Sequence, residues 1–226
     1  MTNGDKPRAI RSFVIRAGRT TPAQQRALKE LWPRYGVDFS PVELNLDELY
    51  GRRAPRMVEI GFGNGENLAA LAANHPNVDY LGIEVHPPGV GHLLRTLAAS
   101  HLTNVRVSCH DAVEVFAQQL PAESLDEVLV LFPDPWPKKR HHKRRLIQTP
   151  FAQCVAARLK SGALLRLATD WQPYAEHMQQ ALDACHGLER LASGLRPQQH
   201  ERIVTRFEQR GERLGHSIWE LVYRRR

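Results

Sequence analysis

The chain has 226 residues, of which 31 are Lys or Arg and 24 are Asp or Glu, so its formal net charge at pH 7 is +7. A hydrophobic fraction of 42% and a charged fraction of 24% are ordinary for a globular protein, and they exclude a fully disordered chain, a collagen and a disulfide-rich scaffold. The length fits one large domain or a domain with extensions.

The basic excess is concentrated in three segments rather than spread along the chain. Residues 1–29 carry a formal charge of +6, residues 138–145 carry +6 and residues 196–226 carry +4, so the remaining residues sum to −9. This segregation indicates a polyanionic partner for the basic segments and a cationic small ligand for the acidic body. Solvated basic termini are the alternative explanation.

The sequence shows no signal for a membrane segment or a metal site. No apolar run approaches the roughly 20 residues of a transmembrane helix, and the N-terminus lacks the apolar core of a signal peptide. Cys109, Cys154 and Cys185 are far apart and form no C-x-x-C pair, so neither a zinc site nor a disulfide framework is expected. We therefore expect a cytoplasmic protein without metal.

The N-terminal part consists of a basic arm followed by a short helix. Residues 1–20 have no sustained periodic pattern and are expected to order on binding or to remain a loose tail. Pro22 begins a helix-like run that Pro33 and Gly36 end. Residues 36–55 are predicted to be a connection.

From residue 56 onward, strand-like and helix-like segments alternate. Strands are predicted at 57–62, 78–85, 104–109, 125–132 and 162–169, helices at 66–74, about 91–101, 112–120, a stretch ending near 160 and 173–186, and two further strand candidates at 201–206 and 216–223. The alternation with short loops implies a parallel α/β sheet with helices on both faces.

Three glycines, Gly61, Gly63 and Gly65, follow the first predicted strand. They permit a tight turn and a close approach of the backbone to a ligand. Their spacing is not the G-x-G-x-x-G of dinucleotide binders, and a glycine-rich turn alone is often structural. In an open α/β sheet, ligands bind at the carboxyl ends of the strands, which is where this turn lies.

Four carboxylates are expected near the same edge. Glu59 lies within the first strand, Glu84 ends the second strand 19 residues after Gly65, and Asp111 and Asp134 follow the third and fourth strands. Glu84 stands where an acid accepts hydrogen bonds from a ribose. A ring of acids would repel a pyrophosphate, so it favours S-adenosylmethionine, which carries a sulfonium cation and no phosphate, over NAD. For each acid a helix N-cap is the alternative, most clearly for Asp111.

A proline-rich loop, residues 132–137, follows the fourth strand. Its three prolines make it stiff around Asp134 and Trp136. The basic block 138–145 comes directly after it, so a nucleic-acid backbone could be anchored next to the cofactor. A solvated helix start or a localisation signal is the alternative for this block.

The chain contains, in this order, the motifs SFVIRAGRTTPAQQRAL, VEIGFGNGENL, GIEVHPPGVG, HDAVEVF, LFPDPWPKKRHHKRRL, ATDWQPYAEHM and TRFEQRGERLGHSIWEL. Together they resemble the bacterial tRNA (guanine-N7-)-methyltransferases from about Ser12 to Tyr223. The resemblance implies a class I (Rossmann-like) α/β methyltransferase fold with a seven-stranded, mostly parallel sheet. It also implies that S-adenosylmethionine methylates N7 of a guanine in the tRNA variable loop. We divide the chain into a basic arm and helix, residues 1–35, and a methyltransferase domain, residues 36–226.

The resemblance also implies roles for single residues. It assigns cofactor binding to Glu59, Glu84, Asp111 and Asp134, beside the turn glycines Gly61 and Gly63, and makes Asp134 the catalytic residue. Substrate contacts are implied for Lys138, Asp170, Thr205, Arg206, Phe207 and Glu208. The family often has His, Lys and Met where this chain has Pro137, Arg206 and Asn64, and none of these departures removes an acid.

Guanine N7 is an uncharged acceptor with an available lone pair, so it needs no deprotonation before it attacks a methyl group. The chemistry therefore mainly requires alignment, and a fixed carboxylate near the purine would stabilise the positive charge that develops there. We assign this role to Asp134. Asp170 and Glu208 are candidates for the N1–H and N2 edge of the guanine; an ion pair with Arg206 or Arg210 is the alternative for Glu208.

Three other functions stay open on the sequence alone. A nucleic-acid amino-methyltransferase is suggested by Asp134-Pro135-Trp136, although the second proline of the D-P-P-Y/W loop is missing. A non-catalytic RNA-binding module would not explain the acids, and a nicotinamide oxidoreductase is disfavoured by the glycine spacing. We expect tRNA as the partner, no membrane contact and no obligatory protein partner, which is compatible with a monomer.

Overall fold

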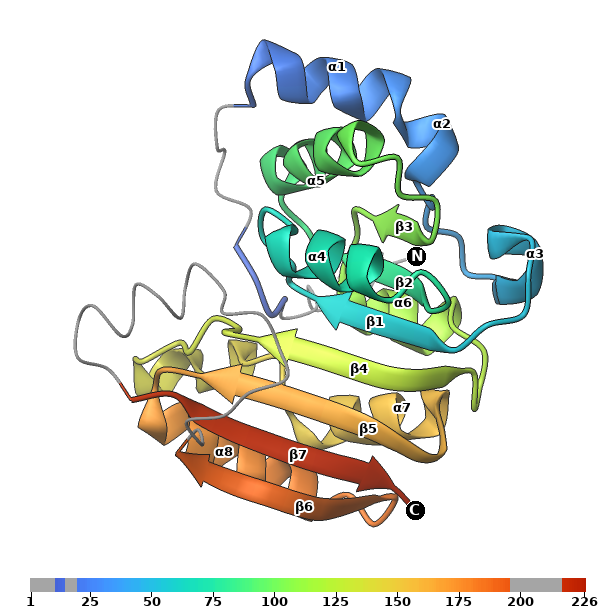
Figure 1. Ribbon diagram of the computed structural model, residues 1–226. Coiled ribbons are helices and arrows are strands. Elements are labelled where there is room, and N and C mark those ends of the chain that lie inside the picture. Colours follow the sequence, from blue (N-terminus) through green and yellow to red (C-terminus); the bar gives the residue numbers. More distant parts are fainter. Residues whose placement is uncertain (1–10, 15–19, 196–216) are drawn as a thin grey trace, which may run out of the picture.

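The computed structural model describes residues 11–14, 20–195 and 217–226, and these form one seven-stranded sheet with helices on both sides (Figure 1). Along the chain the elements are α1 (Pro22–Glu30), α2 (Trp32–Tyr35), α3 (Leu46–Tyr50), β1 (Arg56–Ile60), α4 (Glu66–Asn74), β2 (Asp79–Ile83), α5 (Pro87–Ala99), β3 (Val105–Ser108), α6 (Ala112–Gln118), β4 (Leu125–Leu131), the 3-10 helix η1 (Lys139–Arg144), α7 (Thr149–Arg158), β5 (Leu159–Thr169), α8 (Gln172–Asp183), β6 (Leu188–Leu195) and β7 (Trp219–Arg225).

The sheet has the strand order β3-β2-β1-β4-β5-β7-β6. The pairs β1–β2, β1–β4, β2–β3 and β4–β5 are parallel, and β7 is antiparallel to both of its neighbours, β5 and β6. The predicted mostly parallel α/β sheet is therefore confirmed. The carboxyl ends of β1 to β5 share one edge, so the loops that follow these strands meet there.

Helices cover the central strands on both faces (Figure 1). On one face, α4 and α5 bury Leu68 and Leu94 against β2 and β3, and α1 packs on α5. On the other face, α6, α7 and α8 bury Phe116, Val155 and Tyr174. Because β4 lies between these two layers, its run from Val128 onward is buried on both sides, which explains its uninterrupted apolar sequence.

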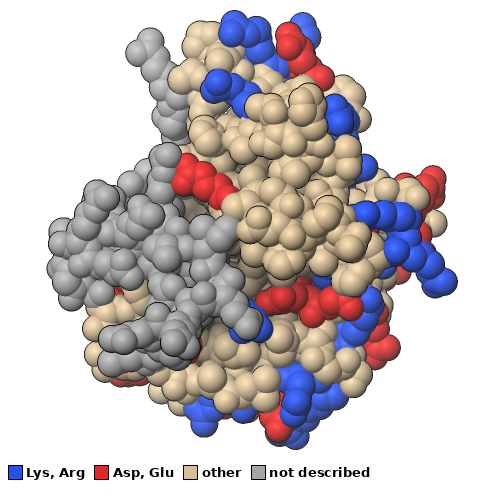
Figure 2. All heavy atoms as spheres, in the orientation of Figure 1, with Lys and Arg blue, Asp and Glu red and all other residues tan. Residues whose placement is uncertain are grey.

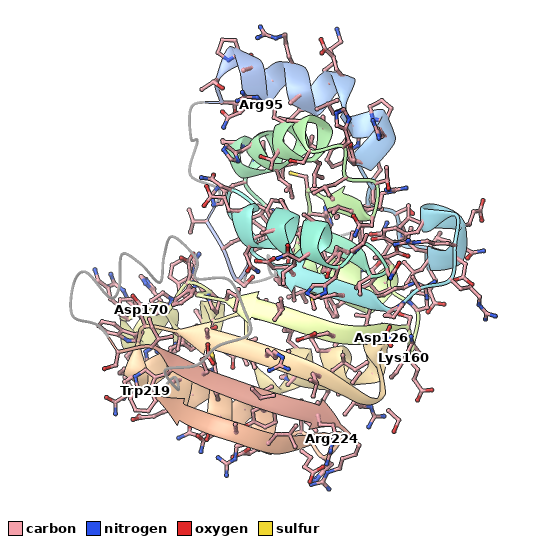
Figure 3. All side chains as sticks on the ribbon, viewed as in Figure 1. Arg95, Asp126, Lys160, Asp170, Trp219 and Arg224 are labelled. Atoms are coloured by element: carbon pink, nitrogen blue, oxygen red, sulfur yellow. The ribbon has the colours of Figure 1, made fainter. Side chains whose placement is uncertain are left out.

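Several acids at the amino ends of the strands are paired with cations. Asp79, which starts β2, binds Arg52 at 2.6 Å, and Asp126 of β4 binds Lys160 of β5 at 2.7 Å. On the face shown in Figure 2, blue and red side chains accordingly lie next to one another at the right-hand margin. Figure 3 places Asp126 and Lys160 together at the end of the sheet opposite Asp170. Part of the acidic body is thus neutralised far from the carboxyl edge.

The structure corrects several predicted boundaries. The predicted connection 36–55 contains α3, which Asn45 caps by accepting a hydrogen bond from the Glu48 N–H at 3.3 Å. Pro33 does not end a helix but lies in the first turn of α2, where proline has no donor to lose. Helix α5 begins at Pro87, earlier than predicted.

The C-terminal strands also differ from the prediction. Strand β6 was not predicted, because LERLASGL combines charged and small residues and a bulge interrupts its pairing with β7 between Arg190 and Ala192. The candidate at 216–223 corresponds to β7, displaced towards the C-terminus. The candidate at 201–206 lies outside the described residues.

The N-terminal helix is attached to the sheet layer. The side-chain amide of Gln24 donates to the Pro88 carbonyl at 2.9 Å, and a Cβ on Gly91 would come within 2.9 Å of Gln24. Glycine at position 91 therefore lets α1 and α5 approach closely. The boundary at residue 35 stays a prediction. Among the residues that the structure describes, no helix is long and apolar enough to cross a membrane.

Candidate functional site

A cavity of about 360 Å³ opens at the carboxyl edge of the sheet, among the loops that follow β1, β2, β3 and β4. It brings together the following residues singled out in the sequence: Gly61, Gly63, Glu84, Asp111 and Asp134. Ligand pockets typically have volumes of about 300–1,000 Å³, so the cavity is large enough for a small organic cofactor.

The glycine turn forms one wall of the cavity. Gly61 and Gly63 have φ angles of 73° and 59°, in the left-handed region that favours glycine. The turn is also packed from behind, because a Cβ on Gly89 of α5 would lie only 2.1 Å from the Gly63 carbonyl oxygen. Glycine at position 89 thus allows helix α5 to approach the backbone that lines the cavity.

Replacing Gly89 by Ala is therefore expected to displace the Gly63 carbonyl, weaken cofactor binding and lower stability by about 1–3 kcal/mol, as overpacking typically does. Calorimetric titration with S-adenosylmethionine and a thermal melt measure the two effects. Gly187→Ala is the matched control, because its methyl would meet no backbone atom: it would lie 3.2 Å from the end of the Arg225 side chain and 3.4 Å from the Ala156 Cβ. Equal cofactor affinity in both variants would contradict the proposed packing constraint.

Glu84 braces the glycine turn with its carboxylate. One carboxylate oxygen accepts from the Gly63 N–H at 2.9 Å, and the other accepts from the N–H groups of Val85 at 2.7 Å and His86 at 3.1 Å. A carboxylate has about four acceptor positions, so these three bonds leave about one for a ligand hydroxyl. Glu84 can therefore hold the turn and accept from a ribose at the same time.

Glu59 lies behind the turn rather than in the cavity wall. Its side chain is buried, and it accepts a hydrogen bond from the side-chain amide of Asn67 in α4 at 3.1 Å. This contact joins β1 to the helix that follows the glycine turn. The predicted contribution of Glu59 to cofactor binding stays a prediction.

Asp111 is the N-cap of α6, the alternative role that the sequence suggested for it. Its carboxylate accepts a hydrogen bond from the Val113 N–H at 3.0 Å. It also lines the cavity. Burial raises the pKa of this carboxyl, and the hydrogen bond from Val113 opposes that effect. A cationic or hydrogen-bond-donating ligand at this position would favour the charged form.

The loop after β4 carries Asp134 at the mouth of the cavity in a strained conformation. Phe132 and Trp136 have φ angles of 52° and 46°, which cost of order 1–3 kcal/mol each in a non-glycine residue and persist only when the surroundings enforce them. The Phe132 N–H donates to the Ala168 carbonyl at 2.8 Å. Asp134 is itself exposed, so its carboxylate is accessible to a substrate.

A buried arginine supports the same loop from below. Arg145 is only 4% exposed, its Nε donates to the Pro135 carbonyl at 3.0 Å, and its guanidinium lies 4.9 Å from the ring centre of Tyr174 in α8. Burial raises the pKa of Tyr174, so its hydroxyl stays protonated and accepts from the Ile147 N–H at 3.3 Å. Arg145 therefore connects the residue after Asp134 to the core.

The predicted substrate residues that the structure describes lie at the same edge. Lys138 is exposed at the start of η1, and Asp170 follows β5 directly, where Figure 3 shows it beyond the carboxyl end of that strand. The remaining four, Thr205, Arg206, Phe207 and Glu208, lie outside the described residues.

Sequence reasoning missed Asn67, Gly89 and Arg145. Asn67 and Gly89 lie in the quoted motifs but carried no chemical signal of their own, and Arg145 was counted with the exposed basic block. The signal for Arg145 was its position directly before Leu146 and Ile147, where the chain turns inward. Within the described ranges, no group of three or more His, Cys, Asp and Glu side chains could hold a metal ion.

Comparisons with known proteins identify the family of the chain. A family model described as "Putative methyltransferase" matches residues 53–221. The chain is 54% identical to a tRNA (guanine-N(7)-)-methyltransferase of Thiobacillus denitrificans, over 99% of this chain and 98% of that protein. It is 56% identical to the protein of the same name from Alkalilimnicola ehrlichii, over 97% of this chain and 94% of that protein.

Solved structures share the fold at low sequence identity. The 16S rRNA methyltransferase KamB has a TM-score of 0.59 at 13% identity, over 80% of this chain and 93% of that one. TrmN from Thermus thermophilus has a TM-score of 0.57 at 16% identity, over 90% of this chain and 48% of that one. The class I methyltransferase fold is therefore confirmed.

Proposed function

The chain belongs to the tRNA (guanine-N(7)-)-methyltransferase family, and we propose that its methyl transfer takes place beside Asp134 at the carboxyl edge of the sheet. It is an S-adenosylmethionine-dependent enzyme that methylates N7 of guanine in tRNA. Family membership removes the oxidoreductase, the non-catalytic module and the amino-methyltransferase as alternatives. One observation supports this position for the reaction: Glu84, Asp111 and Asp134 line the same cavity. The basic block, residues 138–145, follows the loop of Asp134 directly in the sequence.

The residues of the cavity fit S-adenosylmethionine. Glu84 keeps about one acceptor position for a ribose hydroxyl. Asp111 and Asp134 add carboxylates, which favour a cationic ligand over a pyrophosphate. When it is bound, S-adenosylmethionine supplies the electrophilic methyl group.

The protein's part in the reaction is positioning and charge stabilisation. N7 of guanine has a free lone pair, so no side chain has to remove a proton from it before the transfer. The stiff loop 132–137 holds Asp134 at the cavity mouth, where its carboxylate stabilises the positive charge that develops on the purine. Asp170 lies at the same edge (Figure 3), and in this proposal it accepts from the N1–H and N2 edge of the guanine.

The finer assignments belong to the same proposal. The target guanine lies in the tRNA variable loop, and Lys138 binds the backbone of that loop. The substrate is also contacted by Thr205, Arg206, Phe207 and Glu208, an assignment that the quoted family motifs support. Residues 1–35 are assigned as the basic arm and helix, and the enzyme works as a monomer in the cytoplasm.

The test is methylation of an unmodified tRNA transcript with methyl-labelled S-adenosylmethionine, followed by nucleoside identification. We expect label in 7-methylguanosine, from a position in the variable loop. A transcript in which that guanine is replaced by adenine is the control and should stay unlabelled. Label in an exocyclic amine, or in 7-methylguanosine of the control transcript, would contradict the proposal.

A further inference from the structure

A second and larger cavity, of about 1040 Å³, adjoins the cofactor cavity. It lies between the start of α6, the segment from η1 to α7, and residues 11–14. Ser12, Phe13, Asp111 and Leu146 line both cavities, so the two are separated by no more than these side chains. We call the second cavity the α6–α7 groove; the predicted site residues do not account for it, since Asp111 alone of them lines it.

The groove has an excess of positive charge. Its lining includes the basic residues Arg11, Lys143, Arg144 and Arg145 and the acids Asp111 and Glu114. Both acids have nearby donors: Asp111 caps α6, and Glu114 lies 2.5 Å from the ring nitrogen Nε2 of His110. Arg145 is buried beneath the loop of Asp134, so the accessible cations are Arg11, Lys143 and Arg144; they favour an anion and disfavour a second sulfonium compound.

The floor of the groove is apolar. Val113 on α6 is 40% exposed, although it is a large hydrophobic residue, and Leu146 and Pro150 continue the surface above the buried Phe151. An apolar floor beside a cationic wall matches the two halves of a nucleotide. Its base stacks on apolar or aromatic surface, and its phosphate is attracted to Lys and Arg.

The walls of the groove contact the loop 132–137, which carries Asp134. Trp136 donates from Nε1 to the Ser12 carbonyl at 3.1 Å, and the Arg144 guanidinium lies 5.3 Å from the centre of the Trp136 ring. Residues 11–14 form one wall, and Arg11 lies over the Phe13 ring at 5.7 Å. Since Trp136 is two residues from Asp134, the groove and the reaction site share one support.

We propose that the α6–α7 groove binds a nucleotide that adjoins the target guanine in the tRNA chain. This inference rests on the proposed function, because it takes the guanine to lie beside Asp134. The neighbouring base lies over Val113 and Leu146, and its phosphate is bound by Lys143. The enzyme thus binds the RNA strand on one side of the guanine, and this contact orients the guanine towards the cofactor.

Two variants test the groove without touching the reacting residues. Val113→Trp fills the floor, and Lys143→Glu reverses one charge of the wall. Val42→Trp, at a valine that is 65% exposed and lines neither cavity, controls for an added indole. Arg53→Glu, whose side chain is 92% exposed before the amino end of β1, controls for the charge reversal. Steady-state kinetics with tRNA, tRNA affinity across a salt series, and calorimetry with S-adenosylmethionine are the measurements.

We expect Val113→Trp to raise KM for tRNA about tenfold, as the loss of one stacked base would, with cofactor affinity unchanged. Lys143→Glu should reduce the slope of log affinity against log salt by about 1. If KM and the salt slope equal those of the two controls, the proposal is wrong. Loss of cofactor affinity in Val113→Trp with KM for tRNA unchanged would assign the groove to the cofactor and also overturn it. Failure of the proposed function is distinguishable, because the unaltered enzyme would then form no 7-methylguanosine.

Discussion

Replacing Asp134 by Asn is expected to reduce kcat for methyl transfer by about 10²–10³-fold, because the variant loses the carboxylate that stabilises the charge developing on the purine. The side chain keeps nearly the same shape, and it is exposed at the cavity mouth, so the fold should be unaffected. Single-turnover rates with saturating tRNA and S-adenosylmethionine measure the effect on the chemical step.

Asp126→Asn provides a matched control for this experiment. Asp126 is a carboxylate of β4, the strand that Asp134 follows, but it lies at the opposite end of that strand, where it pairs with Lys160 and accepts from the Arg56 N–H (Figure 3). Its loss should lower stability slightly and leave kcat unchanged. If Asp134→Asn binds both ligands normally and transfers methyl groups at nearly the unaltered rate, then the electrostatic role of Asp134 is wrong.

The second large effect is expected for Arg145→Lys. Lysine keeps the charge but loses both the planar group over Tyr174 and the Nε donor to the Pro135 carbonyl. Hydrogen bonds to charged groups contribute about 1.5–3 kcal/mol, so we expect a clear loss of stability, at about 2–4 °C of Tm for each kcal/mol. Because Pro135 follows Asp134 directly, kcat should fall about tenfold, as a small displacement of a reacting group would cause.

Arg158→Lys separates a positioning role for Arg145 from a purely structural one. Arg158 also donates from Nε to a backbone carbonyl, that of Phe116 at 2.8 Å, but it lies at the end of α7, away from the cavity. Both variants should lower Tm, and only Arg145→Lys should lower kcat. A fall in Tm with unchanged kcat in both variants would show that Arg145 acts on stability alone.

Much of the fold could be predicted from local sequence, because each central strand is a short apolar run bounded by turns and followed by an amphipathic helix. The apolar run is clearest in β4, although a proline-rich loop rather than a helix follows it. Elements whose formation depends on tertiary contacts rather than on local sequence were not predicted. Strand β6 has a polar, glycine-containing sequence and exists through its pairing with β7, and α3 is a five-residue helix that its cap residues define.

The candidate site was predictable in position but only partly in detail. The spacing from Gly65 to Glu84 placed an acid at the end of β2, and the structure brings it to the cavity with Asp111 and Asp134. Spacing could not show that Glu84 already accepts three backbone hydrogen bonds. It also could not show that Glu59 lies beneath the turn, bound by Asn67, rather than in the wall.

The sequence by itself determined the class of the sheet, the edge at which the ligands bind and the chemistry of the acids, because these follow from periodicity and from residues that succeed one another in the chain. Only the tertiary structure decided which groups share a cavity and which support it. Arg145 lies in a run of basic residues, yet it is buried under the loop of Asp134, and Ser12 meets Trp136 across 124 positions. Such contacts join segments that no local pattern connects, since they arise from packing of the folded chain.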